Sequence, residues 1–179
     1  MSSRSDSIYF SLPCDRYTPF SLARKIGAKA ILESARFNRG RERYSILMAE
    51  EAFHLLQDDE GVAIVVDGER RPSPVAVLSG AALVGGEAPK REPDILDALL
   101  HIARENELPV RGIPVPASGI GYLGYEFCAR CDTIHLSPQT DTLHIPESEF
   151  IVGHLYIVFD HFTEMLHIFA LNYEEHQID

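Results

Sequence analysis

Two segments of the chain carry apolar residues at helical spacing. In YTPFSLARKIG, residues 17–27, Leu22 and Ile26 share one face. Thr18 can cap the amino end of this helix and Gly27 can end it. The second segment, EPDILDALLHIARENELP, has an acidic start that suits the helix dipole and a proline near its end. Its predicted apolar stripe consists of Leu96, Leu99, Leu100 and Ala103.

Runs rich in β-branched and aromatic residues predict two hairpins. In AFHLLQDDEGVAIVV the turn falls at residues 58–61, between two strand-forming runs. In FIVGHLYIVFDHFTEMLHIFALN the turn falls at residues 160–164. Both runs of the second hairpin are too apolar to be half solvated, so each is expected to lie inside a sandwich or under a helix.

Two shorter apolar runs, residues 30–32 and 44–47, predict a further pair of strands around a polar segment. The basic residues of this segment are Arg36, Arg39, Arg41 and Arg43. Such a segment is more typical of a solvated loop than of a binding patch. Residues 69–92 are expected to form a weakly structured connection or a short edge element. Together the pattern favours an α+β fold, with a largely antiparallel β-sheet or sandwich and a few packed helices.

The expected organisation is a flexible amino terminus over residues 1–16, one domain over residues 17–173, and a polar tail over residues 174–179 that looks truncated. A chain of 179 residues is long enough for one domain with a sizeable core.

The composition excludes several classes of partner. A formal net charge of −11 argues against nucleic acid and against an anionic membrane surface. No apolar run approaches the roughly 20 residues of a membrane helix, and the first residues lack the apolar core of a secretory signal. Three cysteines, an odd number, do not suggest a disulfide framework. A cytoplasmic protein is therefore expected.

Cys128 and Cys131 form a C-x-x-C pair, with His135 shortly after it. Thiolates at this spacing can share a zinc ion or form a redox dithiol. A structural zinc site needs four ligands, however, and the sequence has no second C-x-x-C. Two cysteines that share a helix without chemistry are favoured, so no metal site is predicted. A zinc or redox role remains the alternative.

Two further patterns, a glycine motif and an Asp-His pair, could indicate nucleotide binding or acid–base catalysis, but each has a better structural explanation. Residues 119–124, GIGYLG, fit the dinucleotide pattern G-x-G-x-x-G, but a Pro-rich loop precedes them instead of a strand. A strand packed closely against another backbone explains these glycines better. Asp160 and His161 could act as an acid–base pair, but polar turn residues are the favoured interpretation. The P-loop, nucleophile-elbow and H-E-x-x-H motifs are absent from the sequence, so no catalytic residue is assigned.

Four segments follow one another between residues 17 and 171: YTPFSLARKIGAKAILESA, RYSIL, GIGYLGYEF and YIVFDHFTEMLHIFA. Together they resemble the N-terminal region of anthranilate synthase component I, a chorismate-utilising enzyme family. The first is similar to the family's opening helix and Leu-Leu-Glu-Ser-Ala strand, and the third to its Gly-Tyr-Leu-Gly-Tyr-Asp segment. The resemblance implies a regulatory and structural domain. The catalytic region, with its Mg²⁺ site, would follow the tail, so no cofactor is expected in this fragment.

The resemblance also implies a tryptophan feedback site at the end of the first short strand. Carried over residue by residue, this site consists of Leu32, Glu33, Ser34, Tyr44 and Ser45. A hydroxyl and a carboxylate at a strand end can bind the charged groups of a free amino acid, and apolar neighbours can hold an indole. A plain strand terminus with solvent-facing polar groups is the alternative interpretation.

The implied function is the formation of anthranilate and pyruvate from chorismate and glutamine-derived ammonia. The implied partner is a glutamine amidotransferase subunit, and the implied effector is L-tryptophan. Two alternatives remain open. One is the N-terminal domain of aminodeoxychorismate synthase component I, where some members hold tryptophan as a structural ligand. The other is a free-standing amino-acid-binding module.

Overall fold

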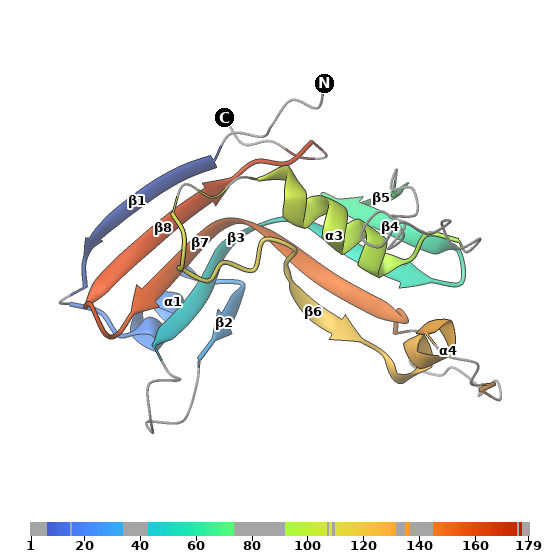
Figure 1. The fold of residues 1–179 in the computed structure, drawn as a ribbon, viewed down its shortest axis with the longest axis horizontal. Helices are drawn as coiled ribbons and strands as arrows, with labels where there is room; N and C mark the ends of the chain where they lie inside the picture. The colour runs from blue at the N-terminus through green and yellow to red at the C-terminus, as the bar shows by residue number, and fades with distance from the viewer. Residues whose placement is uncertain are drawn as a thin grey trace. The chain divides into compact units, whose positions relative to one another are not determined.

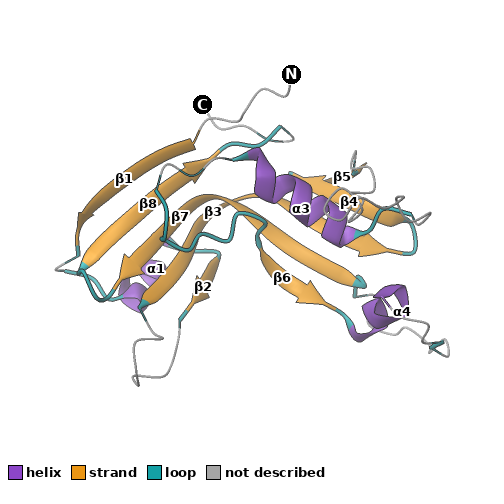
Figure 2. Cartoon of the chain, viewed as in Figure 1, coloured by secondary structure: helices purple, strands orange, loops and turns teal. Residues whose placement is uncertain are grey.

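The computed structural model describes residues 7–14, 16–33, 43–73, 92–106, 108, 110–131, 135–136, 145–174 and 176. The strands are β1 (Ser7–Pro13), β2 (Ala30–Leu32), β3 (Tyr44–Asp58), β4 (Gly61–Val66), β5 (Glu69–Pro72), β6 (Ile120–Leu123), β7 (Ser148–Asp160) and β8 (Met165–Leu171). The helices are α1 (Pro19–Ile26), α3 (Ile95–Glu105), α4 (Cys128–Cys131) and a 3₁₀ turn, η1 (Tyr125–Phe127). Figure 1 shows these elements along the chain, and Figure 2 shows how far strands outweigh helices.

The strands form one hydrogen-bonded sheet in the order β1-β8-β7-β3-β4-β5, with β2 on β3 and β6 on β7. The pairs β1–β8, β2–β3, β3–β4, β4–β5, β6–β7 and β7–β8 are all antiparallel. The predicted α+β class with a largely antiparallel sheet is confirmed. The described residues fall into two compact units. Those within 1–52, 102–117 and 152–179 form the first unit, and those within 53–101 and 118–151 form the second.

The core of the first unit is built from α1 and from strands β3, β7 and β8. Its buried members are Leu47, Ile157, Phe159 and Leu166. Leu22 and Ala23 of α1 pack against this cluster. The predicted helical face is therefore only partly buried, because Ile26 at the end of the same helix is 41% exposed.

Helix α1 begins and ends as its sequence predicts. The Thr18 hydroxyl accepts a hydrogen bond from the Ser21 N–H at 3.2 Å, and the Ser21 hydroxyl accepts one from the Thr18 N–H at 3.0 Å. This reciprocal pair satisfies two backbone donors at the helix start. At the other end Gly27 adopts a left-handed conformation, with φ of 67°, which only glycine adopts at little cost.

Replacing Thr18 with alanine is expected to lower the free energy of unfolding by about 1 kcal/mol, because one helix donor then loses its acceptor. Urea unfolding followed by circular dichroism measures the change. Thr18→Ser keeps the hydroxyl and should stay close to the wild type. Equal losses in both variants would contradict a capping role for the hydroxyl.

Strand β1 lies where the sequence predicts a flexible amino terminus. Its seven residues pair with β8 from Ser7↔Leu171 to Pro13↔Met165. The Tyr9 hydroxyl lies 2.9 Å from Nδ1 of His167. Ile8, Tyr9 and Phe10 are residues that favour strands, and the edge of β8 supplies the hydrogen-bonding partner for this short segment.

Helix α3 is present as predicted, but its buried face is not the predicted one. The buried apolar residues are Ile95, Ala98, Leu99 and Ile102, whereas Leu96 is 42% exposed and Leu100 is 41% exposed. Contacts at the amino end fix this rotation. The Ile95 N–H donates to Oε1 of the buried Gln57 at 2.9 Å, and Asp97 accepts from the Asp94 N–H at 3.0 Å. Of the predicted stripe, Leu99 alone is buried.

Both predicted hairpins are confirmed, with turns between β3 and β4 and between β7 and β8. The run at residues 44–47 does not end before the first hairpin, because β3 continues without a break from Tyr44 to Asp58. Beyond the first hairpin, β5 pairs with β4, so residues 69–72 form a short edge element. The part of the predicted connection at residues 74–91 lies outside the described residues.

The glycine pattern at residues 119–124 belongs to a strand. Gly121 lies inside β6, opposite Phe150 of β7. A methyl group built on Gly121 would lie 2.0 Å from the carbonyl oxygen of Glu149. The predicted close approach of two backbones is therefore confirmed. The C-x-x-C pair begins and ends the short helix α4.

Candidate ligand-binding site

Four of the five predicted site residues lie at one end of the β2–β3 pair. Leu32 is the last residue of β2 and pairs with Ile46, and Glu33 follows it. Tyr44 and Ser45 are the first residues of β3. Ser34 lies outside the described residues. Among the described residues, the polar groups that end β2 thus neighbour those that begin β3.

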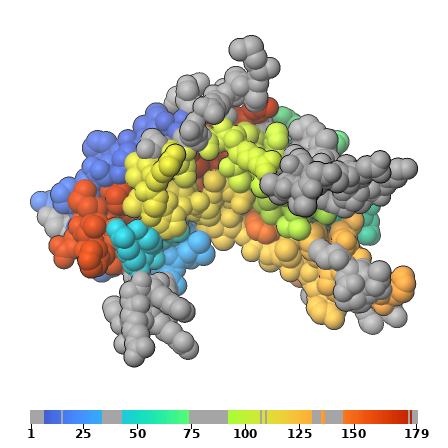
Figure 3. Space-filling view, viewed as in Figure 1, coloured from blue at the N-terminus to red at the C-terminus, as the bar shows by residue number. Residues whose placement is uncertain are grey.

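Tyr44 is held at this strand end by its hydroxyl, which donates to the carbonyl oxygen of Gly112 at 3.1 Å. Figure 3 shows the start of β3 in cyan, with the segment near residue 112 in yellow and the β7–β8 turn in red beside it. The ring is half-buried. Leu32 is 41% exposed and Glu33 is also exposed, so apolar and acidic groups are both accessible here.

Ser45 is less accessible than its neighbour. It is only 4% exposed, and its hydroxyl lies 2.8 Å from Nε2 of His161. Successive residues of a strand point to opposite faces, so Ser45 shares a face with the core residue Leu47 and Tyr44 does not. A ligand would meet Tyr44 directly and would reach the Ser45 hydroxyl only by competing with His161.

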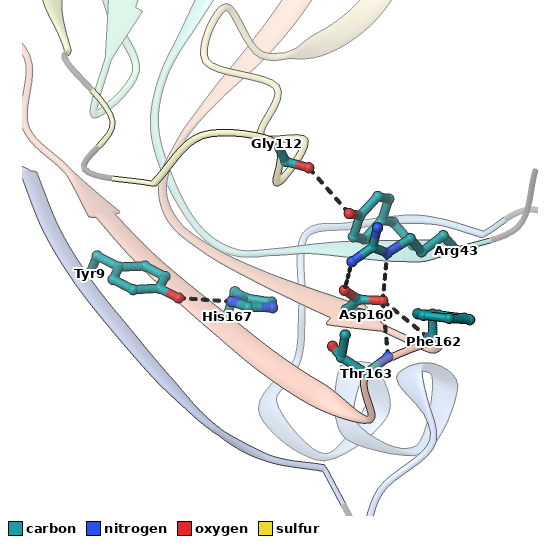
Figure 4. Close-up of polar contacts among 8 residues, drawn as sticks. Tyr9, Arg43, Gly112, Asp160, Phe162, Thr163 and His167 are labelled. Atoms are coloured by element: carbon teal, nitrogen blue, oxygen red, sulfur yellow. Dashed lines mark hydrogen bonds and ion pairs between the residues drawn. The ribbon is translucent and has the colours of Figure 1, made fainter.

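Arg43, directly before β3, makes the strongest polar contact of this region (Figure 4). Its Nε donates to Oδ1 of Asp160 at 2.9 Å, and its Nη2 donates to Oδ2 at 2.5 Å. The Asp160 side chain is 1% exposed and also accepts from the N–H groups of Phe162 and Thr163, at 3.0 and 3.4 Å. The Arg43 hydrogen bonds, more than these backbone donors, hold the pKa of the Asp160 carboxyl well below its usual range.

Two aromatic rings flank the Arg43 guanidinium. Its central carbon lies 4.9 Å from the centre of the Tyr44 ring and 5.7 Å from that of Phe162. Both distances are within the range of a cation–π contact. The backbone of Arg43 is also held to the β7–β8 turn, because the N–H of His161 donates to the carbonyl of Arg43 at 2.8 Å. The β7–β8 turn and the start of β3 thus form one polar unit.

The sequence interpretation missed the partners in this unit. The sequence pattern predicts a solvated loop for Arg43. Its side chain is 44% exposed, but it forms an ion pair with Asp160. Asp160 and His161 are not paired with each other. Asp160 holds Arg43, and His161 contacts Ser45. The available signal was Asp-His at a predicted turn, which indicates polar residues but not their partners.

Other candidate chemistry finds no support in the described part of the chain. There, no group of three or more His, Cys, Asp or Glu residues is arranged to hold a metal ion. Cys128 is half-buried and carries no disulfide. No helix within the described ranges is long and apolar enough to cross a membrane.

Comparison with known proteins gives one strong sequence relationship. No family model matches the chain. Anthranilate synthase component 1 of Spirochaeta aurantia is 40% identical over 169 residues, which cover 94% of this chain and 32% of that protein. The crystal structure of anthranilate synthase component I from Streptococcus pneumoniae TIGR4 aligns with 89% of this chain and 31% of its own, at 20% identity and a TM-score of 0.47.

Identity at this level over nearly the whole chain confirms the resemblance drawn from the four motifs. The chain is a relative of anthranilate synthase component 1. It corresponds to 32% of the length of the Spirochaeta aurantia protein, component 1 of anthranilate synthase.

Proposed function

We propose that this chain acts as the regulatory and structural part of an anthranilate synthase component I. The observation that supports this most directly is the 40% identity to such a protein over 94% of the chain. The complete enzyme would convert chorismate and glutamine-derived ammonia to anthranilate and pyruvate, with a glutamine amidotransferase subunit as partner. The residues of this chain would carry no catalytic step, and Mg²⁺ would be held elsewhere in the enzyme.

The test is the product formed by the complete natural polypeptide that contains these residues. Incubated with chorismate, ammonium and Mg²⁺, it should release anthranilate, which is identified by its fluorescence and mass. Release of aminodeoxychorismate instead would assign the chain to the sister enzyme. Absence of turnover, combined with tight tryptophan binding, would favour a free-standing amino-acid-binding module.

The proposed regulatory site consists of Leu32, Glu33, Ser34, Tyr44 and Ser45. All of these except Ser34, which is outside the described residues, lie at the end of the β2–β3 pair. Three features of the described residues support it. Leu32 and Glu33 are both exposed at the end of β2, and the Tyr44 hydroxyl at the start of the paired strand is anchored to Gly112. A carboxylate can pair with the ammonium of tryptophan, and the apolar groups can contact its indole.

Replacing Ser34 with alanine is expected to raise the tryptophan concentration that half-inhibits the complete enzyme by roughly tenfold. This corresponds to the loss of one hydrogen bond to a charged group of the ligand. Turnover without tryptophan should stay close to that of the wild type. Ser11→Ala, on the exposed part of β1, serves as the matched control. An unchanged inhibition curve would remove Ser34 from the site.

A further inference from the structure

We infer that the contact between His154 and His176 is a pH-sensitive switch, which holds residues 172–174 and 176 on the first compact unit at neutral pH and releases them in acid. This inference does not depend on the proposed function. The two imidazole rings meet edge to edge, with Nε2 of His154 2.6 Å from Nδ1 of His176. The other ring nitrogen of His154, Nδ1, lies 2.7 Å from the carbonyl oxygen of Leu171. Both nitrogens of the His154 ring are therefore engaged.

The partners of the two rings fix where their protons lie. A carbonyl oxygen only accepts hydrogen bonds, so Nδ1 of His154 carries a proton. In a neutral imidazole the other nitrogen is then an acceptor, and Nε2 of His154 receives the Nδ1–H of His176. One added proton is tolerated, because the contact needs a single hydrogen between the two nitrogens. If both rings are charged, two N–H groups face each other at 2.6 Å and the contact must break.

The surroundings of His154 oppose the second proton. The residue is 2% exposed, and burial is the chief cause that lowers the pKa of its imidazole, with a smaller contribution from the charge of His176. The Leu171 carbonyl and Glu50 of β3 act in the opposite direction without cancelling this effect. The Tyr173 ring lies 5.8 Å away, and burial raises the pKa of its phenol, so it stays neutral. Docking is therefore favoured above about pH 6.5, the ordinary histidine pKa, and weakens as the pH falls below it.

The segment that this contact holds follows β8. Tyr173 is fully buried, and its hydroxyl donates to the carbonyl of Gly153 at 3.0 Å. The N–H of Tyr173 donates to the carbonyl oxygen of His176 at 3.2 Å, so its acceptor belongs to the residue whose ring titrates. The N–H of Glu174 donates to Oε2 of Glu105 at 3.0 Å. These two amide hydrogens therefore report whether the segment is docked.

The experiment measures hydrogen exchange in the complete natural polypeptide by mass spectrometry. The protection of the Tyr173 and Glu174 amides is obtained after correction for the intrinsic exchange rate at each pH. In the wild type this protection should fall by about tenfold or more between about pH 8 and about pH 5, as expected for the loss of one hydrogen bond. In His176→Asn it should change by less than about twofold, because the asparagine amide can donate to a neutral His154 ring and accept from a charged one.

A matched control is available in a histidine that faces a carboxylate. Nδ1 of His54 lies 2.8 Å from Oε1 of Glu149, and both residues belong to the other compact unit. A charged His54 keeps this contact, because the carboxylate accepts its N–H. His54→Gln should therefore lose protection of the Tyr173 and Glu174 amides in acid to the same extent as the wild type. Thermal melting of each variant shows whether it is folded.

The comparison of the wild type with His176→Asn separates the outcomes. If both lose protection equally in acid, another group such as Glu105 releases the segment and the inference is overturned. It is also overturned if the wild type keeps its protection in acid. If His176→Asn does not fold, or leaves the amides unprotected at both pH values, NMR of the wild type labelled at its histidine nitrogens decides. Uptake of the second proton should then coincide with the loss of amide protection, and uptake without that loss would overturn the inference.

Discussion

Replacing Gly121 with alanine is expected to destabilise the chain by about 2–4 kcal/mol, as the cost of overpacking with lost backbone pairing. The added methyl group would lie 2.0 Å from the carbonyl oxygen of Glu149 and 2.6 Å from Cα of Phe150. These are backbone atoms, so no side-chain rotation can relieve the clash. Strand β6 would have to move away from β7 and give up its hydrogen bonds there.

The direction of this change is diagnostic. At an unstrained position, glycine to alanine usually raises stability by about 0.4–1 kcal/mol, because the unfolded chain loses freedom. Urea unfolding of the wild type, Gly121→Ala and Leu123→Ala gives the comparison. Leu123 is in the same strand and is 45% exposed, so its truncation should cost less than about 1 kcal/mol. A Gly121→Ala chain as stable as the wild type would show that β6 is not seated closely on β7.

Local signals in the sequence predict much of this fold. Thr18 and Gly27 bound α1, because a helix cap and a left-handed glycine act within a few residues of chain. Both hairpins are predictable for the same reason, since each turn joins strands that are adjacent in sequence.

Features that depend on distant partners are not predictable in this way. Strand β1 exists because β8 offers it an edge, although more than 150 residues separate Tyr9 from His167. In α3 two sets of residues share the same helical spacing, and the sequence does not say which set faces the core. The hydrogen bond from the Ile95 N–H to the buried Gln57 side chain orients the helix so that the set containing Ile95 faces the core.

In the candidate site, too, local features are predictable from the sequence and long-range contacts are not. A carboxylate at the end of an apolar run makes Glu33 a candidate from sequence alone, and in the structure Glu33 is exposed at that strand end. The ion pair between Arg43 and Asp160 joins residues 117 positions apart. Arginine-rich segments are usually solvated, so no local pattern distinguishes Arg43 from the three arginines before it.

Replacing Asp160 with asparagine is expected to lower the free energy of unfolding by about 2–3 kcal/mol at neutral pH, because a buried carboxylate loses its charge-assisted hydrogen bonds. Asp58→Asn is the matched control. Asp58 pairs with Arg70 in the same bidentate way, but the two side chains are 30% and 36% exposed. Screening by water should limit its loss to about 1 kcal/mol or less.

Lowering the pH should reduce the difference in the free energy of unfolding between the wild type and Asp160→Asn. In the folded chain the pKa of Asp160 is lowered, chiefly by the hydrogen bonds from Arg43. The stabilisation from this shift is complete above the pKa of an unfolded aspartate, about 4, and is lost as the pH falls toward the lower folded value. Asparagine does not titrate. The gap in unfolding free energy should therefore be constant above about pH 5 and narrow below about pH 4. A gap that stays constant down to pH 3, or a loss no larger than that of Asp58→Asn, would show that the ion pair does not stabilise the β7–β8 turn.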